Sequence, residues 1–185
     1  MERKLIIAGI GGQGVIFVTK VLSQAGLMRG EHVMASENHG MSQRGGSVMS
    51  YVKIGGTEAP LIRRGTADVL IGFVRLEAVR NLAFVRAGGQ VCVNSPNGFE
   101  PALLPRLNEL GVKVHTINAD ALAKELGVTA VANLVVLGFA AAHGALGLTV
   151  AELKSAVQAL GPVKAVEMNW KALVIGASKA LLTEA

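Results

Sequence analysis

The glycine-rich segment near the amino terminus constrains the fold more than any other part of the chain. An apolar run leads into Gly9-Ile-Gly-Gly-Gln-Gly14, and a second apolar run follows it. Gly9, Gly11 and Gly14 have the spacing G-x-G-x-x-G, which is typical of a tight turn between a strand and a helix. Glycine permits positive φ there and leaves no Cβ in the way of an approaching group. The first helical turn adds free N–H groups, so the place suits an anion.

The rest of the chain continues this alternation of short apolar runs and helix-like stretches. Glycine makes up 23 of 185 residues, against a usual share of about 7%, and the excess falls in turns between the runs. We therefore predict an α/β fold with a doubly wound, mostly parallel sheet and a Rossmann-like glycine turn. No linker or repeat divides the chain, so residues 1–185 are expected to form a single domain.

The apolar pattern places each expected element. Strands are expected at Lys4–Ala8, His32–Ala35, Ser47–Ile54, Val69–Phe73, Gln90–Asn94 and Val112–Ile117. Helices are expected at Gly14–Met28, Arg75–Arg86, Pro101–Glu109 and Ala119–Leu126. A C-terminal helical segment follows at Ala130–His143, Val150–Leu160 and Lys164–Leu182.

One connection departs from the pattern. After the second strand we expect a polar, glycine-rich loop, Ser36 to Gly46, in place of a helix. A long polar loop at the carboxyl end of a strand usually contributes to a site.

Composition narrows the function. The single cysteine, Cys92, excludes an internal disulfide framework and an iron–sulfur cluster held by this chain alone; it lies in an apolar run and is expected in the core. The net charge of +5 comes from scattered residues without interleaved aromatic rings, which argues against nucleic acid as a partner. It leaves an anionic ligand or an acidic partner chain open.

The uncharged stretch from Val128 to Ala151 is long enough to cross a bilayer. Asn133, Gly138 and His143 interrupt it, so we interpret it as a buried helix. The amino terminus does not resemble a secretory signal. We expect no membrane association and a cytoplasmic protein.

The glycine turn alone is compatible with a stand-alone NAD(P)-binding Rossmann oxidoreductase. That function needs an acidic residue about 20 positions on to hold a ribose, and Glu37 could serve. No later segment supplies an evident nicotinamide site or acid–base pair. The turn could also serve only to pack strand against helix.

The polar loop offers candidate site residues. His39, Ser42 and Arg44 could form a polar cluster, but they define neither a catalytic triad nor a metal site. Arg44 stands before Gly45 and Gly46, and a guanidinium beside glycine N–H groups suits a carboxylate, a phosphate or an acidic partner residue. His115 and His143 lie in apolar runs and are expected to be core or capping residues.

Two motifs together carry a family resemblance. Gly9-Ile-Gly-Gly-Gln-Gly14 and Glu37-Asn-His-Gly-Met-Ser-Gln-Arg-Gly-Gly-Ser-Val48 resemble the small subunit of the 2-oxoacid:ferredoxin oxidoreductases. The likeness covers essentially the whole chain and is closest to the beta subunit of indolepyruvate ferredoxin oxidoreductase. Asn38 stands where threonine is commoner in that family.

The resemblance implies a complex that oxidatively decarboxylates an arylpyruvate with coenzyme A, giving an aryl-acetyl-CoA, CO2 and reduced ferredoxin. It implies that thiamine diphosphate, Mg2+ and [4Fe-4S] clusters belong to a large alpha subunit, and that this chain alone binds no cofactor and is inactive. The expected assembly is a hetero-oligomer, with a homodimer as the alternative state of the isolated chain.

The resemblance also points to a site, with no catalytic residue assigned to this chain. The glycine turn (Gly9, Gly11, Gly12, Gln13, Gly14) and the loop residues (Ser42, Gln43, Arg44, Gly45, Gly46) are expected to converge at the carboxyl edge of the sheet. There they would hold a coenzyme A anion or form the face turned toward the partner's active site. A third interpretation is that both segments only make contacts between subunits.

Overall fold

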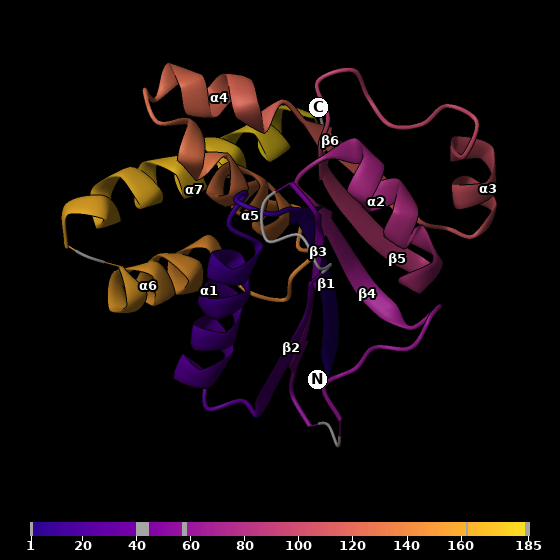
Figure 1. Ribbon diagram of the computed structural model, residues 1–185, viewed down its shortest axis with the longest axis horizontal. Coiled ribbons are helices and arrows are strands. Elements are labelled where there is room, and N and C mark those ends of the chain that lie inside the picture. The colour runs from indigo at the N-terminus through magenta and orange to yellow at the C-terminus, as the bar shows by residue number, and fades with distance from the viewer. Residues whose placement is uncertain (1, 40–44, 57–58, 162, 184–185) are drawn as a thin grey trace.

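The computed structural model describes residues 2–39, 45–56, 59–161 and 163–183 (Figure 1). Six strands form one sheet: β1 Arg3–Ile10, β2 Val33–His39, β3 Ser47–Ile54, β4 Ala67–Gly72, β5 Val85–Asn94 and β6 Lys113–Ile117. The helices are α1 Val15–Met28, α2 Arg75–Asn81, α3 Leu104–Glu109, α4 Ala119–Glu125, α5 Ala132–Ala142, α6 Val150–Leu160 and α7 Val163–Thr183. Short 3-10 turns lie at Leu82–Phe84 and Thr129–Val131.

The sheet has the strand order β2-β3-β1-β4-β5-β6. The pairs β1–β4, β4–β5 and β5–β6 are parallel, whereas β3 runs antiparallel to both β1 and β2. The predicted α/β fold with a mostly parallel sheet is therefore confirmed, with one antiparallel strand inserted beside β1.

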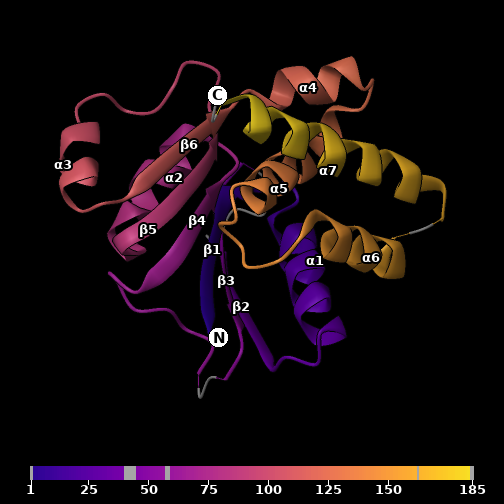
Figure 2. The same ribbon diagram turned by 180° about the vertical axis from the view of Figure 1, so that it is seen from behind.

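Helices cover both faces of the sheet (Figures 1 and 2). Leu5 and Ile7 of β1 point into a core with α1 and the C-terminal helices, while Ile6 and Ala8 point into a second core with α2 and α3. Both faces of β1 are thus buried, which explains why its sequence is a continuous apolar run rather than an alternating one.

Several expected boundaries were wrong. The strand that was expected to end at Ala35 continues as β2 to His39, because residues 36–39 pair with β3. The helix expected over Arg75–Arg86 ends at Asn81, because β5 already begins at Val85. The Arg86 Nε donates to Asp68 Oδ1 at 2.7 Å and ties this early start of β5 to β4.

The helix expected from Pro101 begins only at Leu104, after a turn. The C-terminal helices α5, α6 and α7 lie close to their predicted positions. Most of α5 is buried in the larger core, which explains the uncharged stretch around it. In the part of the chain that the structure describes, no helix is long and apolar enough to span a membrane.

Candidate functional site

The glycine turn closes on itself through Gln13. The Ile10 N–H donates to Gln13 Oε1 at 2.8 Å, and the Gln13 N–H donates to the Ile10 carbonyl oxygen at 3.0 Å. Gly12 and Gly14 have φ of 99° and 78°, in the left-handed region that glycine adopts without strain. The turn is therefore a rigid link between β1 and α1.

The glycines of the turn have different tasks. A Cβ on Gly9 would lie 3.0 Å from both Gln13 Oε1 and Val15 Cγ2, and a Cβ on Gly14 would overlap Asn133 Nδ2. A Cβ on Gly12 would meet nothing within 4 Å. Gly9 and Gly14 thus permit close packing, whereas Gly12 leaves open backbone on the exposed side of the turn.

The Gly45–Gly46 segment lies against the glycine turn. The Gly11 N–H donates to the Gly46 carbonyl oxygen at 2.8 Å, just before β3 begins at Ser47. Gly45 has φ of 76°. The other predicted loop residues, Ser42, Gln43 and Arg44, lie outside the described residues. The structure therefore brings the two predicted segments together at Gly11 and Gly46.

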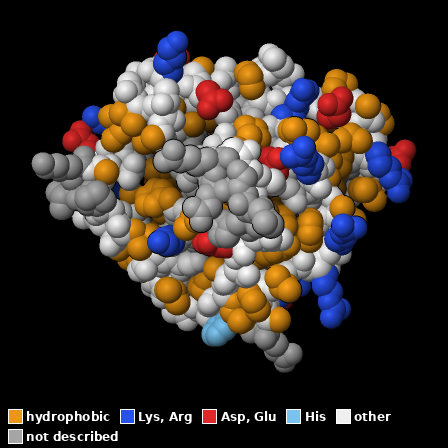
Figure 3. All heavy atoms as spheres, viewed as in Figure 1, with side chains coloured by type: hydrophobic (Ala, Val, Ile, Leu, Met, Phe, Trp, Pro, Cys, Tyr) orange, Lys and Arg blue, Asp and Glu red, His pale blue; other side chains and the backbone are white. Residues whose placement is uncertain are grey.

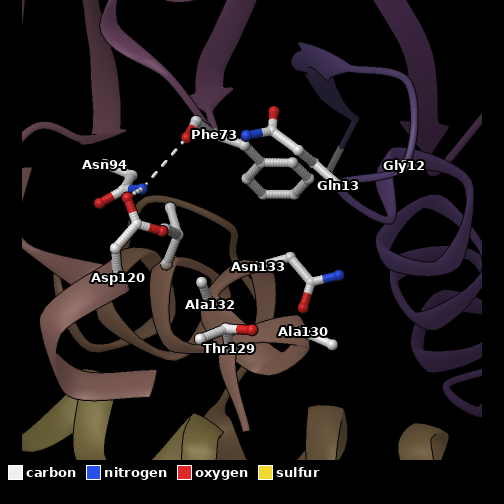
Figure 4. Close-up of a pocket in the computed structure, with 10 residues that line it drawn as sticks. Gly12, Gln13, Phe73, Asn94, Asp120, Thr129, Ala130, Ala132 and Asn133 are labelled. Atoms are coloured by element: carbon white, nitrogen blue, oxygen red, sulfur yellow. Dashed lines mark hydrogen bonds between the residues drawn. The ribbon is translucent and has the colours of Figure 1, made fainter. Parts of the chain in front are cut away.

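A pocket of about 350 Å³ opens beside this turn (Figure 4). It lies at the carboxyl ends of β1, β4 and β5, where the strand order changes direction between β1 and β4. This is the usual position of a ligand site in an open α/β sheet. The residues that line it are Gly12, Gln13, Phe73, Asn94, Asp120, Thr129, Ala130, Ala132, Asn133 and Val136.

Asn94 joins two walls of the pocket. Its Nδ2 donates to the Phe73 carbonyl oxygen at 3.2 Å and to Asp120 Oδ2 at 2.9 Å, and the first of these bonds is drawn in Figure 4. Its Oδ1 accepts from the Ala119 N–H at 2.9 Å. The buried amide thereby fixes the end of β4 and the start of α4 relative to β5.

The polar groups of the pocket are mainly neutral. Gln13, Asn94 and Asn133 offer amides, Thr129 offers a hydroxyl, and Asp120 is the one charged residue among the described residues that line it. Such a lining suits a ligand that exchanges hydrogen bonds better than a bare phosphate, because the carboxylate repels an anion. Positive charge for an anion must therefore come from backbone N–H groups or from groups outside the described lining.

Sequence reasoning found Gly12 and Gln13 but missed the opposite walls. Phe73 follows β4, Asn94 ends β5 and Asp120 lies three residues after β6. Because the carboxyl ends of parallel strands meet at one edge, these polar positions could have been predicted. Asn133 at the start of α5 stood out only as a polar residue in an apolar stretch, and its place in the pocket depends on how the C-terminal helices pack.

The strand order bears on the NAD(P) alternative. Glu37 of β2 pairs with Ser50 of β3, which in turn pairs with Ile7 of β1. Two strand spacings, roughly 10 Å, therefore separate Glu37 from β1. A ribose-binding acid lies on the strand directly beside the glycine turn, and that place is taken here by the antiparallel β3.

The other residues singled out in the sequence lie away from the pocket lining. The His115 and His143 rings stack with centroids 3.9 Å apart, and Phe139 meets the His143 ring edge-on. Cys92 is fully buried in β5, and burial raises the pKa of its thiol to about 12. Cys92 is thus a core residue, as predicted, whereas His115 and His143 are half-buried and His143 caps the end of α5. Among the described residues, no three metal-binding side chains gather at one place.

Fold and pocket define an α/β chain whose glycine turn borders a pocket at the carboxyl edge of the sheet. A family model for pyruvate ferredoxin/flavodoxin oxidoreductase matches residues 4–179. The chain belongs to this family and is a subunit of a 2-oxoacid:ferredoxin oxidoreductase.

Several relatives align with this chain over nearly its full length. The indolepyruvate oxidoreductase subunit IorB of Archaeoglobus fulgidus is 30% identical over 98% of this chain and 96% of that protein. The IorB subunit of Pyrococcus horikoshii is 32% identical over 97% and 96%. The crystal structure of a keto/oxoacid ferredoxin oxidoreductase gamma subunit from Geobacter sulfurreducens superposes with a TM-score of 0.78, at 26% identity, covering 97% of this chain and 99% of the other.

Subunits for other substrates match as well. A ketoisovalerate oxidoreductase subunit, VorA, from Methanothermobacter marburgensis is 32% identical over 95% of this chain but only 36% of its own length. The 2-oxoglutarate synthase subunit KorC of the same organism is 29% identical over 75% of each chain. Membership of the family therefore does not fix the oxoacid. Each of these relatives is named as a subunit, so a partner subunit is implied.

Proposed function

We propose that this chain is the small subunit of a thiamine-diphosphate-dependent arylpyruvate:ferredoxin oxidoreductase, with indolepyruvate as the foremost substrate. The complex would convert an arylpyruvate and coenzyme A into an aryl-acetyl-CoA and CO2 and pass the electrons to ferredoxin. The IorB relatives, 30% and 32% identical over almost the whole chain, support this assignment. The motif that ends in Arg44-Gly-Gly46 supports it as well.

The redox cofactors are assigned to the partner subunit. A [4Fe-4S] cluster needs several cysteine ligands, whereas the one cysteine here is enclosed in β5. Among the described residues, no three His, Cys, Asp or Glu side chains form a metal-binding group. The residues present do not fit a cluster, and we assign thiamine diphosphate with its Mg2+, which would supply the carbanion chemistry, to the larger subunit, as the family resemblance implies.

This chain would supply a shaped face beside that reaction centre. The observation that carries the proposal is the Gly11–Gly46 hydrogen bond, which joins the two motif segments beside the pocket at the carboxyl edge. We assign Gly9, Gly11, Gly12, Gln13 and Gly14 of the turn, with Ser42 to Gly46 of the following segment, to this face. It would contact coenzyme A or border the partner's active site.

Exposed apolar side chains near this edge support the proposal that a partner protein covers it. Ile16 and Leu76, in the first turns of α1 and α2, are 40% and 58% exposed. Figure 3 shows several groups of apolar side chains on this face, interspersed with charged ones, and exposed apolar groups are common where proteins make contact. We propose a hetero-oligomer with the larger subunit, through which ferredoxin is reduced, and a homodimer as the state of the isolated chain.

Co-expression with a large subunit that carries cluster ligands tests the substrate assignment. Ferredoxin reduction is measured with indolepyruvate, phenylpyruvate, ketoisovalerate and 2-oxoglutarate, each with and without coenzyme A. We expect the highest kcat/KM for an arylpyruvate, a strict need for coenzyme A and no turnover by this chain alone. Preference for ketoisovalerate or 2-oxoglutarate, or an active lone chain, would contradict the proposal.

The role of the face is tested at Arg44. If Arg44 holds an anionic part of coenzyme A, Arg44→Ala removes a charged hydrogen bond worth about 1.5–3 kcal/mol. The KM for coenzyme A should then rise about tenfold or more, and Arg44→Lys should restore part of the loss. Weaker assembly with unchanged kcat and KM would instead show that the segment only makes subunit contacts.

A further inference from the structure

Glu77 is a buried carboxylate close to the proposed face. It is the third residue of α2, and its side chain is 3% exposed. Both of its oxygens are occupied: Oε2 accepts from the Ser47 hydroxyl at 2.6 Å, and Oε1 accepts from Arg80 Nη1 at 2.6 Å. Arg80 lies on the next turn of the same helix, whereas Ser47 begins β3.

Ser47 connects this carboxylate to the glycine turn. The residue before it, Gly46, accepts the hydrogen bond from Gly11, and Ser47 itself pairs with Ile10 of β1. A continuous link therefore runs from α2 through Glu77, Ser47 and Gly46 to Gly11. The two ends of the link, the first turn of α2 and the glycine turn, both lie at the carboxyl edge of the sheet.

Packing a short helix through a buried carboxylate carries a desolvation penalty. Taking a charge out of water costs several kcal/mol unless it is well paired, and its cationic partner, the Arg80 side chain, is 58% exposed. An apolar side chain would dock α2 without that cost. What the carboxylate adds is direction, because a short charge-assisted bond fixes where the hydroxyl and its backbone lie.

We infer that Glu77 is a positioning residue of this enzyme. Through Ser47 it holds the Gly45–Gly46 backbone against the glycine turn, and so sets the shape of the face that the subunit presents. The inference depends on the proposed function in one respect, namely that this edge faces the reaction centre. Glu77 itself is placed too deep to act on a substrate.

The test compares variants in the complex assembled with the large subunit. Ser47→Ala removes the link at its exposed end, Ser47→Thr keeps the hydroxyl, and Glu77→Gln removes the charge. Glu109→Gln is the matched control, because Glu109 forms the same kind of pair with Arg106, three residues away at 2.7 Å, on the solvent side of α3. The fraction assembled, kcat and each KM are measured with the 2-oxoacid that the wild-type complex oxidises fastest.

We expect Ser47→Ala and Glu77→Gln to lower kcat/KM about tenfold or more in assembled complex, since small displacements at a reacting face have large effects. Ser47→Thr and Glu109→Gln should stay within twofold of wild type. The double variant should be no worse than Ser47→Ala alone, because Glu77 acts on the face through the Ser47 hydroxyl. A Ser47→Ala complex within twofold of wild type overturns the inference, and it decides the matter even if Glu77→Gln fails to fold.

Failure here can be told apart from failure of the proposed function. If the wild-type complex prefers a different oxoacid, the substrate assignment falls while the comparison of variants still stands. Gly12→Ala alters the same edge outside the link. Loss of activity with Gly12→Ala but not with Ser47→Ala overturns the link alone, and loss with neither overturns the placement of the edge as well.

Discussion

Gly176 of α7 lies directly on the backbone of Val135 in α5. A Cβ at Gly176 would stand 2.8 Å from the Val135 carbonyl carbon and closer still to its oxygen, and a Cβ at Gly138 would meet the Leu173 backbone in the same way. Each helix thus offers a glycine to the other at the crossing. Gly138, which interrupts an apolar run in the sequence, is there because no side chain fits.

This crossing predicts a large loss of stability on minimal enlargement. Gly138→Ala or Gly176→Ala must push the two helices apart, because the opposing atoms are backbone and cannot rotate away. We expect a loss of about 3 kcal/mol in the free energy of unfolding. Urea titration followed by the fluorescence of Trp170, the only tryptophan, and by circular dichroism measures it.

Ser178→Ala is the control for the crossing, because Ser178 is exposed on the same helix. Its unfolding free energy should change by no more than about 0.5 kcal/mol. A loss at Gly176→Ala as small as that of the control would show that α5 and α7 can separate without cost.

Gly14 combines two reasons for being glycine, and the chain allows them to be separated. Its φ is 78° and a Cβ would overlap Asn133 Nδ2, whereas Gly30 has φ of 74° with nothing within 4 Å. Gly30→Ala should therefore cost only the strain of left-handed backbone, about 1–2 kcal/mol. Gly14→Ala should cost more, and in an Asn133→Ala background its cost should fall to that of Gly30→Ala. Equal losses at both glycines in the wild-type background would contradict the contact.

The sequence predicted the strands but not their order in the sheet. Apolar runs and the glycine turn identified β1, α1 and the α/β class, because strands buried on both faces have a distinctive pattern. The insertion of β3 between β1 and β2 was not predicted. The expected connection, Ser36 to Gly46, is already shorter than the dozen or more residues that a parallel crossover needs, so an antiparallel hairpin could have been derived.

The pocket was predictable on one side only. Gly12 follows from the turn motif, and Asn94 and Asp120 could have been found from their positions at strand ends. Asn133 and the contact between Gly11 and Gly46 depend on the packing of distant segments. Glu77 gave no signal at all, because a charged residue in the first turn of a helix usually faces solvent and favours the helix dipole.

The start of α6 predicts a specific response to acid. Glu152 accepts from the Thr149 N–H at 2.7 Å and from its hydroxyl at 2.8 Å, and Arg29 lies 3.5 Å away. The hydrogen bonds from Thr149, with a smaller contribution from the charge of Arg29, lower the pKa of Glu152. The ionised side chain therefore adds stability that is complete above the ordinary pKa of glutamate and is lost as pH falls through the lowered value.

Glu152→Gln should accordingly flatten the acid side of the stability profile while changing little of its shape near neutral pH. Thr149→Ala removes the other half of this capping box and should cost about 1 kcal/mol at pH 7. Thermal unfolding at intervals between pH 3 and 7 measures both, with Glu109→Gln as the exposed control. An acid limb of unchanged steepness in Glu152→Gln would contradict the assignment.

The burial of Cys92 predicts that its rate of modification by a thiol reagent measures unfolding. Burial within β5 raises the pKa of its thiol to about 12, so almost no thiolate exists at pH 8, and the sulfur is closed to solvent. A disulfide reagent should therefore modify the native chain only through unfolding, at a rate that rises with urea in step with the loss of circular dichroism. Ser155→Cys places a thiol on the exposed side of α6 and should react within seconds to minutes under native conditions. Rapid modification of Cys92 in the wild-type chain would show that β5 opens without global unfolding, and would place the weakest part of the sheet beside Asn94 and the pocket.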